Sequence, residues 1–231
     1  MITDQSVVLE DLLVTRHSCR AFLDRPVPAA TIERLLWLAQ RSASWSNTQP
    51  WQVIVTTGEG TERFRRALRE EADRRAADGG GMDSDFPRPG RYDPVHNERR
   101  RECGWQLYNA VGVARGDRAA SARQALRNFD LFGAPHAAII TSAASQGVYG
   151  ALDCGVYVGN FLLAAQSLGL AAVAQAALAR YGAFMHGYFS IPDDQKVLVG
   201  ISFGYPDQGD AANSYRTSRA DLSSVVRWVR G

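Results

Sequence analysis

Two arginines and a serine alternate near the start of the chain, in the segment Arg16-His17-Ser18-Cys19-Arg20. In an extended backbone, side chains two positions apart point to the same side. Two guanidinium groups and a hydroxyl would then converge, and the planar fork of an arginine matches the oxygens of a phosphate. The segment predicts an anion site suited to a nucleotide phosphate. Solvated surface arginines are the alternative interpretation of the same residues.

A second polar segment runs from Ser44 to Pro50 and carries alternating amides at Asn47 and Gln49. An amide side chain both donates and accepts hydrogen bonds. The pyrimidine edge of a flavin needs this mixture, because it has carbonyl acceptors beside a ring N–H donor. The alternative is a polar loop of turn-forming residues that leads into the strand beginning at Trp51.

Two further segments carry weaker chemical signals. Small residues fill the stretch from Gly169 to Ala177, where a planar ligand could approach the backbone and a free N–H could reach the flavin N5 atom. In the tail, Arg216 and Arg219 could return to the same phosphate. Gln175 as a solvated strand-end residue, and the tail as an ordinary solvated basic segment, are the alternatives.

Hydrophobic periodicity predicts the elements that position these residues, and their order indicates one α+β domain. Short apolar and β-branched runs predict strands over 51–57, 136–142, 171–175 and 196–203. The proline-containing segment 82–97 is expected to be a surface loop or lid. Helical spacing predicts helices over 4–15, after Pro28, over 62–77, around 98–113, 118–131, 149–168 and 178–188, and near Leu222, Val225, Val226 and Val229.

The composition is that of an ordinary globular chain. Its 231 residues can bury a core without disulfides, and a net charge of +2 does not favour a nucleic-acid partner. The three cysteines lack metal-ligand or redox spacing, which indicates free thiols in a reducing compartment. Because no secretory signal and no apolar run of about 18 residues is found, we expect a cytoplasmic protein without a membrane partner.

Several ligand-binding motifs are missing. No strand is followed by G-x-G-x-x-G, and the glycines at 79–81 lack a following Lys-Ser/Thr pair. Neither G-x-S-x-G nor H-E-x-x-H occurs, and the four histidines lack metal-ligand spacing, so we expect no metal. The arginines of 62–75 alternate with acids, which favours ion pairs within a helix over a nucleic-acid surface.

Taken in order, the polar segments resemble the nitroreductase family of FMN enzymes. The resemblance covers about residues 10 to 228, which is nearly the whole chain. It rests on Arg16-His17-Ser18-x-Arg20, Ser46-Asn47-Thr48-Gln49-Pro50-Trp51, Phe132-Gly133-Ala134-Pro135, Val199-Gly200-Ile201-Ser202-Phe203-Gly204-Tyr205-Pro206 and the tail sequence Arg216-Thr217-Ser218-Arg219.

The resemblance implies an intertwined homodimer, with a central, mostly antiparallel sheet flanked by helices and two FMN sites at the subunit interface. It implies that residues 1–231 form a single FMN-binding domain. Within this domain, 82–130 would shape the substrate pocket or lid, and 207–231 would form a C-terminal dimer arm. The cofactor-binding residues that it implies are Arg16, His17, Ser18, Arg20, Ser46, Asn47, Gln49, Gln175, Ala176, Arg216 and Arg219.

The implied activity is hydride transfer from NAD(P)H, through the flavin N5, to a small electron-poor acceptor such as a nitroaromatic or a quinone, with ping-pong kinetics. No acid–base residue is predicted. Alternatives within the same fold are reductive dehalogenation and heterocycle oxidation, and a flavin-binding protein without turnover is a further one. The chain has Ala43, Trp45 and Ala174 where the family often has Pro, Gly and Pro. Trp45 is large enough to alter the interface or the acceptor pocket.

Overall fold

The computed structural model describes residues 4–87 and 89–231, and its centre is a four-stranded sheet. Each pair of neighbouring strands is antiparallel, which confirms the prediction of an α+β fold around an antiparallel sheet. The strands follow the predicted segments closely, because short β-branched and apolar runs between turns favour strands. Across the sheet they lie in the order β1 (Trp51–Thr56), β2 (His136–Ala143), β4 (Gln195–Gly204) and β3 (Ala171–Gln175).

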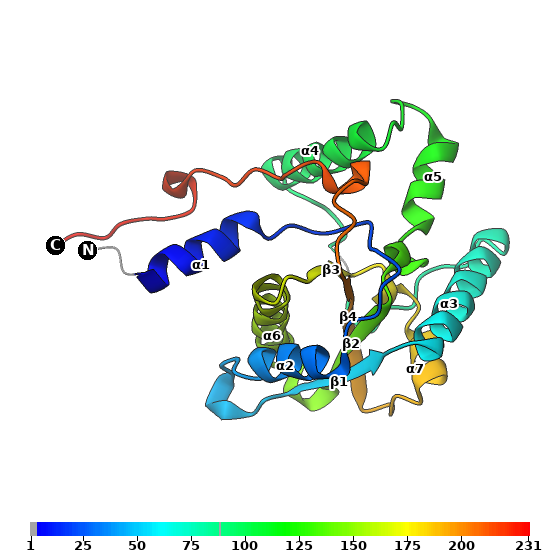
Figure 1. Cartoon of the computed structure of the whole chain (residues 1–231), viewed down its shortest axis with the longest axis horizontal. Coiled ribbons are helices and arrows are strands. Elements are labelled where there is room, and N and C mark those ends of the chain that lie inside the picture. Colours follow the sequence, from blue (N-terminus) through cyan, green and yellow to red (C-terminus); the bar gives the residue numbers. More distant parts are fainter. Residues whose placement is uncertain (1–3, 88) are drawn as a thin grey trace.

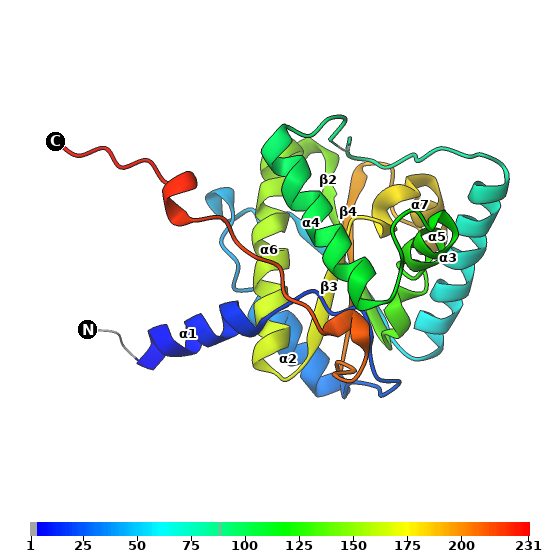
Figure 2. The ribbon, with the colours of Figure 1, turned by 90° about the horizontal axis from the view of Figure 1, so that it is seen from above.

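Helices cover both faces of the sheet (Figures 1 and 2). Strand β2 shows why, because successive side chains of a strand point to opposite faces. Its Ala138 and Ile140 join one hydrophobic core, whereas Ala137 and Ile139 join the other. The first core includes residues of α2 (Ala29–Ala39) and α6 (Gly147–Ser167), and the second includes residues of α3 (Glu59–Ala77) and α7 (Gly182–Phe189).

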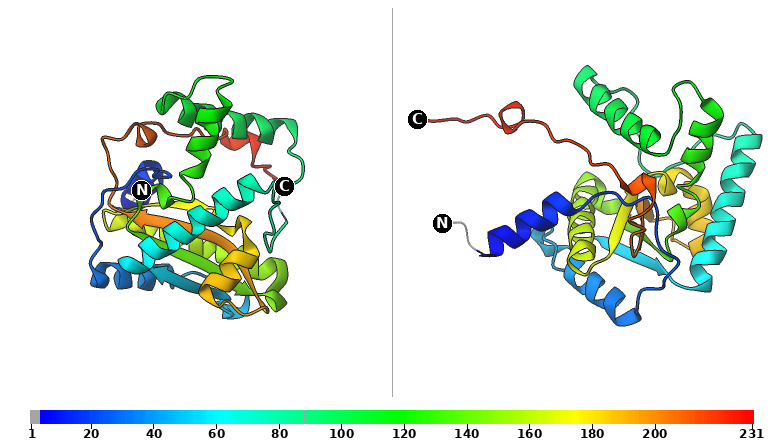
Figure 3. Two further views of the ribbon diagram at one scale, coloured as in Figure 1. Left: turned by 90° about the vertical axis from the view of Figure 1, so that its right-hand side faces the viewer. Right: turned by 45° about the horizontal axis from the view of Figure 1, so that its top comes forward.

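Two helices lie beyond the sheet, α4 (Pro94–Ala110) and α5 (Arg118–Leu126) (Figure 3). None of the described residues of α4 or α5 is buried. Helix α4 begins before the predicted residue 98, because a proline is well suited to the first helical turn. Helix α5 ends at Leu126, before the predicted residue 131, and the helix cannot include Leu131 and Phe132, whose positive φ angles of 54° and 53° do not occur in a right-handed helix.

Both ends of the chain extend away from the body on the same side (Figures 1 and 3). Helix α1 (Asp4–Thr15) has the predicted bounds, yet none of its residues, all of them described, is buried. The predicted C-terminal helix is wrong: around the predicted residues, the described tail forms a 3-10 turn at Leu222–Ser224 and no α-helix. A short helix is marginal unless its apolar face packs on something. The tail instead leaves Leu222, Val225, Trp228 and Val229 exposed.

By length and composition, one helical stretch, Ala144–Ser167, could cross a membrane. It contains α6, the longest of the described helices, and is interrupted by Asp153 and Asn160. Tyr157 and Phe161 of α6 are buried against the sheet. The apolar composition of α6 is therefore explained by its place in the core of the fold.

Candidate cofactor site

The predicted anion segment and the tail meet at one cavity, which we call the arginine cavity. Its volume is about 570 Å³. Arginines from both ends of the chain therefore line the same cavity, and their role toward a phosphate stays a prediction. Its lining residues are Arg16, His17, Ser18, Arg20, Arg216 and Arg219, together with Leu13, Val14, Cys103 of α4, Tyr215 and Thr217.

The segment of residues 16–20 lies beside the edge strand β3 and is extended at Ser18, as the predicted alternation of side chains requires. Ser18 forms a parallel bridge with Ala172 of β3, and the Cys19 N–H donates to the Ala172 carbonyl at 3.3 Å. Cys19 is fully buried, so its side chain lies on the opposite side from its neighbours in the cavity. The sheet edge thus holds Ser18 and Arg20 on one side, facing the tail.

Asn213 joins the tail to this segment. Its side-chain carbonyl accepts from the Arg20 N–H at 2.7 Å, and its amide group donates to the carbonyls of Ala21 and Asp207. Because Asn213 is buried, losing these bonds would leave polar groups unsatisfied. Tyr215 also contributes, accepting from Arg20 Nη1 at 2.9 Å. Sequence reasoning missed both residues as site residues, although they stand directly before the predicted arginines of the tail.

Like charges crowd the arginine cavity. Burial, followed by the nearby Arg219 guanidinium, lowers the pKa of Arg16. Burial is also the largest cause that lowers the pKa of His17, and the guanidiniums of Arg216, Arg16 and Arg20 act in the same direction. A bound anion would relieve this repulsion, and a phosphate has the charge and the acceptor oxygens to do so.

The predicted amide segment forms a strained turn. Ser46, Asn47 and Gln49 have φ angles of 47°, 57° and 48°, in the left-handed region that non-glycine residues rarely enter. Such strain costs of order 1–3 kcal/mol per residue, and it is typical of functional sites. All three side chains are exposed. The turn thus presents the predicted polar groups outward in a conformation that the surrounding structure must enforce.

A buried carboxylate holds this turn in place. Asp153 of α6 accepts from the Trp45 N–H at 3.0 Å, and Ser44 Oγ accepts from the Gln49 N–H at 2.9 Å. The Trp45 ring also packs edge-on against Tyr149, with centroids 4.5 Å apart. Asp153 was not predicted, although a lone acid in an apolar helix is a signal that could have identified it.

The third predicted group lies at the end of β3. The Gln175 side chain is buried and bonded inside the protein, so it does not point out of the fold. Ala176 is exposed, and in the described part of the chain its N–H donates to no other residue. The backbone of Ala176, rather than the side chain of Gln175, is therefore available to a ligand.

Within one chain, the amide turn is separated from the other two groups. The arginine cavity lies near the end of α6, where Gln166 donates to Thr15 at 3.0 Å, whereas the amide turn contacts Tyr149 near its start. At 1.5 Å per residue, these two positions are about 25 Å apart along the helix. Along β3, by contrast, Ala172 and Ala176 are about 13 Å apart at 3.3 Å per residue. One chain thus brings together the arginines and Ala176, but not the amide turn.

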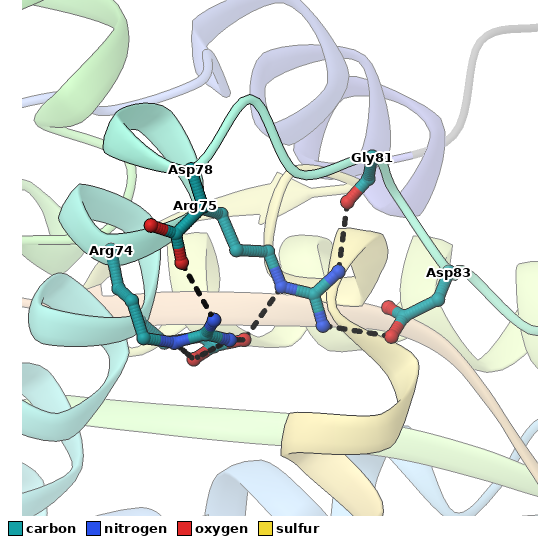
Figure 4. Close-up of polar contacts among 6 residues, drawn as sticks. Arg74, Arg75, Asp78, Gly81 and Asp83 are labelled. Atoms are coloured by element: carbon teal, nitrogen blue, oxygen red, sulfur yellow. Dashed lines mark hydrogen bonds and ion pairs between the residues drawn. The ribbon is translucent and has the colours of Figure 1, made fainter.

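A strap of residues 79–87 connects α3 to the loop before α4. Figure 4 shows Arg75 of α3 between Gly81 and Asp83, to which it donates at 2.8 Å each. Further along, Asp85 accepts from the His186 ring at 2.9 Å and from the Val197 N–H at 2.7 Å. The first residues of the predicted lid segment, up to Asp85, are therefore fixed to α7 and β4.

Comparison with known proteins assigns this chain to a family. The sequence pattern of the Nitroreductase family matches residues 13–205. The nitroreductase NfnB of Mycolicibacterium smegmatis is 34% identical over 229 residues, which cover 98% of this chain and 95% of the relative. A 4-nitrobenzoate reductase of Pseudomonas putida is 30% identical, over 95% of this chain and 93% of its own length.

A solved structure is equally similar. The crystal structure of the FMN-dependent nitroreductase NfnB from Mycobacterium smegmatis in complex with NADPH has a TM-score of 0.91 and 34% identity to this chain. The match covers 98% of this chain and 100% of that one. The resemblance noted in the sequence is therefore confirmed over almost every residue, and this chain belongs to the nitroreductase family.

Proposed function

We propose that this chain is an FMN-dependent oxidoreductase that takes hydride from NAD(P)H and reduces small electron-poor acceptors, nitroaromatics first among them. The observation that carries the proposal is the arginine cavity, where Arg16 and Arg219 crowd like charges and no acidic side chain is among the described residues of the lining. The relatives named above support the choice of cofactor, since one is called FMN-dependent and was crystallised with NADPH.

The residues present fit an FMN. Arg16, Arg20 and Arg219 would hold its phosphate, with Ser18 as a shorter donor. The Ala176 N–H lies about 13 Å further along β3 at 3.3 Å per residue, a distance that a ribityl chain and a ring can span. Bound FMN supplies the redox chemistry, accepting hydride at N5 and passing electrons to the acceptor. The protein supplies orientation, charge and the exclusion of water.

The nicotinamide and the acceptor would use the same place in turn. The sequence contains no dinucleotide-binding motif, so the reduced nicotinamide would dock directly over the flavin and leave before the acceptor enters. We infer that residues 82–130, whose root is fixed by the strap, shape the pocket that selects the acceptor. Steady-state rates against both substrates should then give parallel double-reciprocal lines, as a ping-pong mechanism requires.

The proposed activity is tested with the purified protein. We expect a yellow protein whose flavin absorption bleaches on anaerobic addition of NADPH and returns on addition of 4-nitrobenzoate. A yellow protein that does not bleach with either nicotinamide nucleotide would instead support a flavin-binding protein without turnover. A colourless protein that also takes up no added FMN would contradict the proposal altogether.

We further propose that two chains complete each site. The amide turn and the arginine cavity lie at opposite ends of α6, so a two-fold axis that pairs α6 antiparallel with its copy would bring the partner's turn to this chain's cavity. The outward side of α6 supports this pairing, because Gly155 and Gly159 leave room for a close approach. Its exposed apolar residues are Val148, Tyr149, Leu152 and Val156.

Helix α1 and the tail would wrap this dimer. Both project from the body and expose apolar side chains that the single chain does not cover (Figure 2). We infer that residues 207–231 act as a dimer arm and that α1 gains its missing contacts from the partner.

The three free cysteines fit a reducing, cytoplasmic setting.

Mixed dimers test the shared site. If each site takes Arg16 from one chain and Asn47 from the other, co-expressed Arg16→Ala and Asn47→Ala chains should form heterodimers with one intact site and one doubly defective site. Random pairing would restore about a quarter of the wild-type sites, although each variant alone binds FMN poorly. If both residues served one site from the same chain, mixing would restore nothing, and the shared-site proposal would be wrong.

A further inference from the structure

A buried polar network surrounds the side chain of Gln175 at the end of β3. Its amide group donates to Asn128 twice, to the backbone carbonyl at 3.0 Å and to the side-chain carbonyl at 3.3 Å. Its own carbonyl accepts from the Ser202 hydroxyl at 2.5 Å. Gln175 and Ser202 are both buried, so the bond between them is shielded from water, and the bonds to Asn128 are partly buried. The network thus ties the end of β3 to β4 and to the segment after α5.

The chain is fixed again three residues later. Leu178 lies directly over Gly200, which is the ladder partner of Gln175. A Cβ at position 200 would overlap Leu178 Cδ1 and lie 2.9 Å from Leu178 Cβ, so this contact requires a glycine. The two residues between these anchors, Ala176 and Ala177, form a turn whose ends cannot shift independently of the sheet.

The N–H groups of this turn are left for a ligand. In the described part of the chain, neither Ala176 nor Ala177 donates its N–H to another residue. Their methyl groups offer no hydrogen bond of their own, so only the backbone can recognise a ligand here. The direction of these N–H groups therefore depends on the anchors at Gln175 and Leu178.

We propose that Gln175 is a positioning residue that aims the Ala176 N–H at the flavin N5, and that it thereby sets the relative affinity of the protein for oxidised and reduced FMN. The inference rests on the proposed function. N5 of an oxidised flavin offers a lone pair, whereas N5 of a reduced flavin carries a hydrogen. A fixed N–H donor at this atom favours the oxidised form, so it lowers the reduction potential.

Gln175→Leu tests this inference, because leucine keeps the approximate volume and removes every bond of the network. One neutral hydrogen bond is worth about 0.5–1.5 kcal/mol net, which corresponds to a change of roughly two- to twelvefold. We expect the ratio of FMN affinities to shift by that factor toward the reduced form. The potential of bound FMN should rise, by about 30 mV for a tenfold shift of a two-electron couple.

Two further variants keep the test decisive if Gln175→Leu folds poorly. Gln175→Met keeps the approximate length and removes the donor to Asn128 without adding a charge, and Ser202→Ala removes the hydroxyl that holds the Gln175 carbonyl. Both should raise the potential, Ser202→Ala by less, since the two contacts to Asn128 remain. The matched control is Gln52→Leu, because Gln52 is an exposed glutamine of β1.

The measurements are the potential of bound FMN, from equilibration with a reference dye, and the free energy of unfolding of the apoprotein. A purely structural role would lower the unfolding free energy and leave the potential at the wild-type value, which would overturn the inference while the proposed function stands. A wild-type chain that binds no FMN would overturn both. A raised potential in the three network variants, with Gln52→Leu unchanged, would support the inference.

Discussion

The guanidinium of Arg219 acts on that of Arg16, adding to burial in lowering the pKa of Arg16, although nearly the whole chain separates the two residues in sequence. Two like charges held beside one cavity destabilise the chain that carries them, unless an anion lies between them. Cofactor affinity and apoprotein stability should therefore respond in opposite directions when one of these charges is removed.

Arg219→Ala is expected to weaken FMN binding by roughly ten- to a hundredfold, because a hydrogen bond to a charged group is worth about 1.5–3 kcal/mol. The melting temperature of the apoprotein should stay the same or rise, since a repulsion is lost. Fluorescence titration with FMN and thermal melts of the apoprotein measure the two effects. Arg63→Ala, which removes an exposed arginine paired with Glu59, is the control and should change neither quantity appreciably.

Asp153→Ala should release the strained amide turn. The Trp45 N–H would lose its acceptor, and the free energy of unfolding should fall by about 1–3 kcal/mol, the range for an unsatisfied buried group. Urea denaturation measures this loss. Asp153→Asn keeps an acceptor oxygen and should lose less. Equal losses in both variants would show that the charge, not the hydrogen bond, is what matters.

His136 should make the fold sensitive to acid. Burial, the largest cause, lowers its pKa from the ordinary 6.5, and its Nε2 accepts the Val27 N–H at 2.9 Å, which only the neutral ring can do. The unfolded chain then binds more protons, so the free energy of unfolding should decline as pH falls below 6.5 toward the lowered pKa. His17 adds an effect of the same sign. Urea midpoints of His136→Gln, measured against pH, should show a shallower acid slope than wild type.

His186 should act in the opposite direction. Burial disfavours its charged form, but the Asp85 carboxylate and the Ile191 carbonyl, which face its two ring nitrogens, outweigh burial and raise the pKa, against a smaller opposing effect of Lys196. This stabilisation is fully present below pH 6.5 and is lost as pH rises through the raised pKa. His186→Gln should flatten the alkaline side of the stability profile. An unchanged alkaline slope would contradict a charged pair at the strap.

Much of the fold follows from local patterns. The strand at 171–175 and the helix at 4–15 have their predicted bounds, because a short run of apolar residues and the spacing of Leu9, Leu12 and Leu13 are local properties. What covers an apolar face is not a local property. Helix α1 therefore has the expected face, yet its own chain leaves all of its residues unburied, and the tail, which lacks a covering surface, does not form the predicted helix.

In the candidate site, too, local patterns could be predicted and contacts between distant segments could not. Residue types identified Arg16, Ser18 and Arg20, since charge and alternation are visible in sequence. The hydrogen-bond partner of the Gln175 amide is Asn128, which lies forty-seven positions away, and no spacing rule connects the two residues. Asp153 is visible in sequence as a lone acid in an apolar helix, but its partner is a backbone N–H that becomes available only through the conformation of a distant turn.

The two attachment points of the strap have a consequence for how the family can diversify. A methyl group on Gly182 would lie 2.5 Å from the Asp83 carbonyl oxygen, and Asp85 is bonded to α7 and β4, so the strap up to Asp85 tolerates little change in length. Exposed loops accept insertions and deletions far more readily than packed segments. Length variation should therefore concentrate between Asp85 and Pro94, where it can move α4 over the sheet and alter which acceptors enter, while both cores stay as they are.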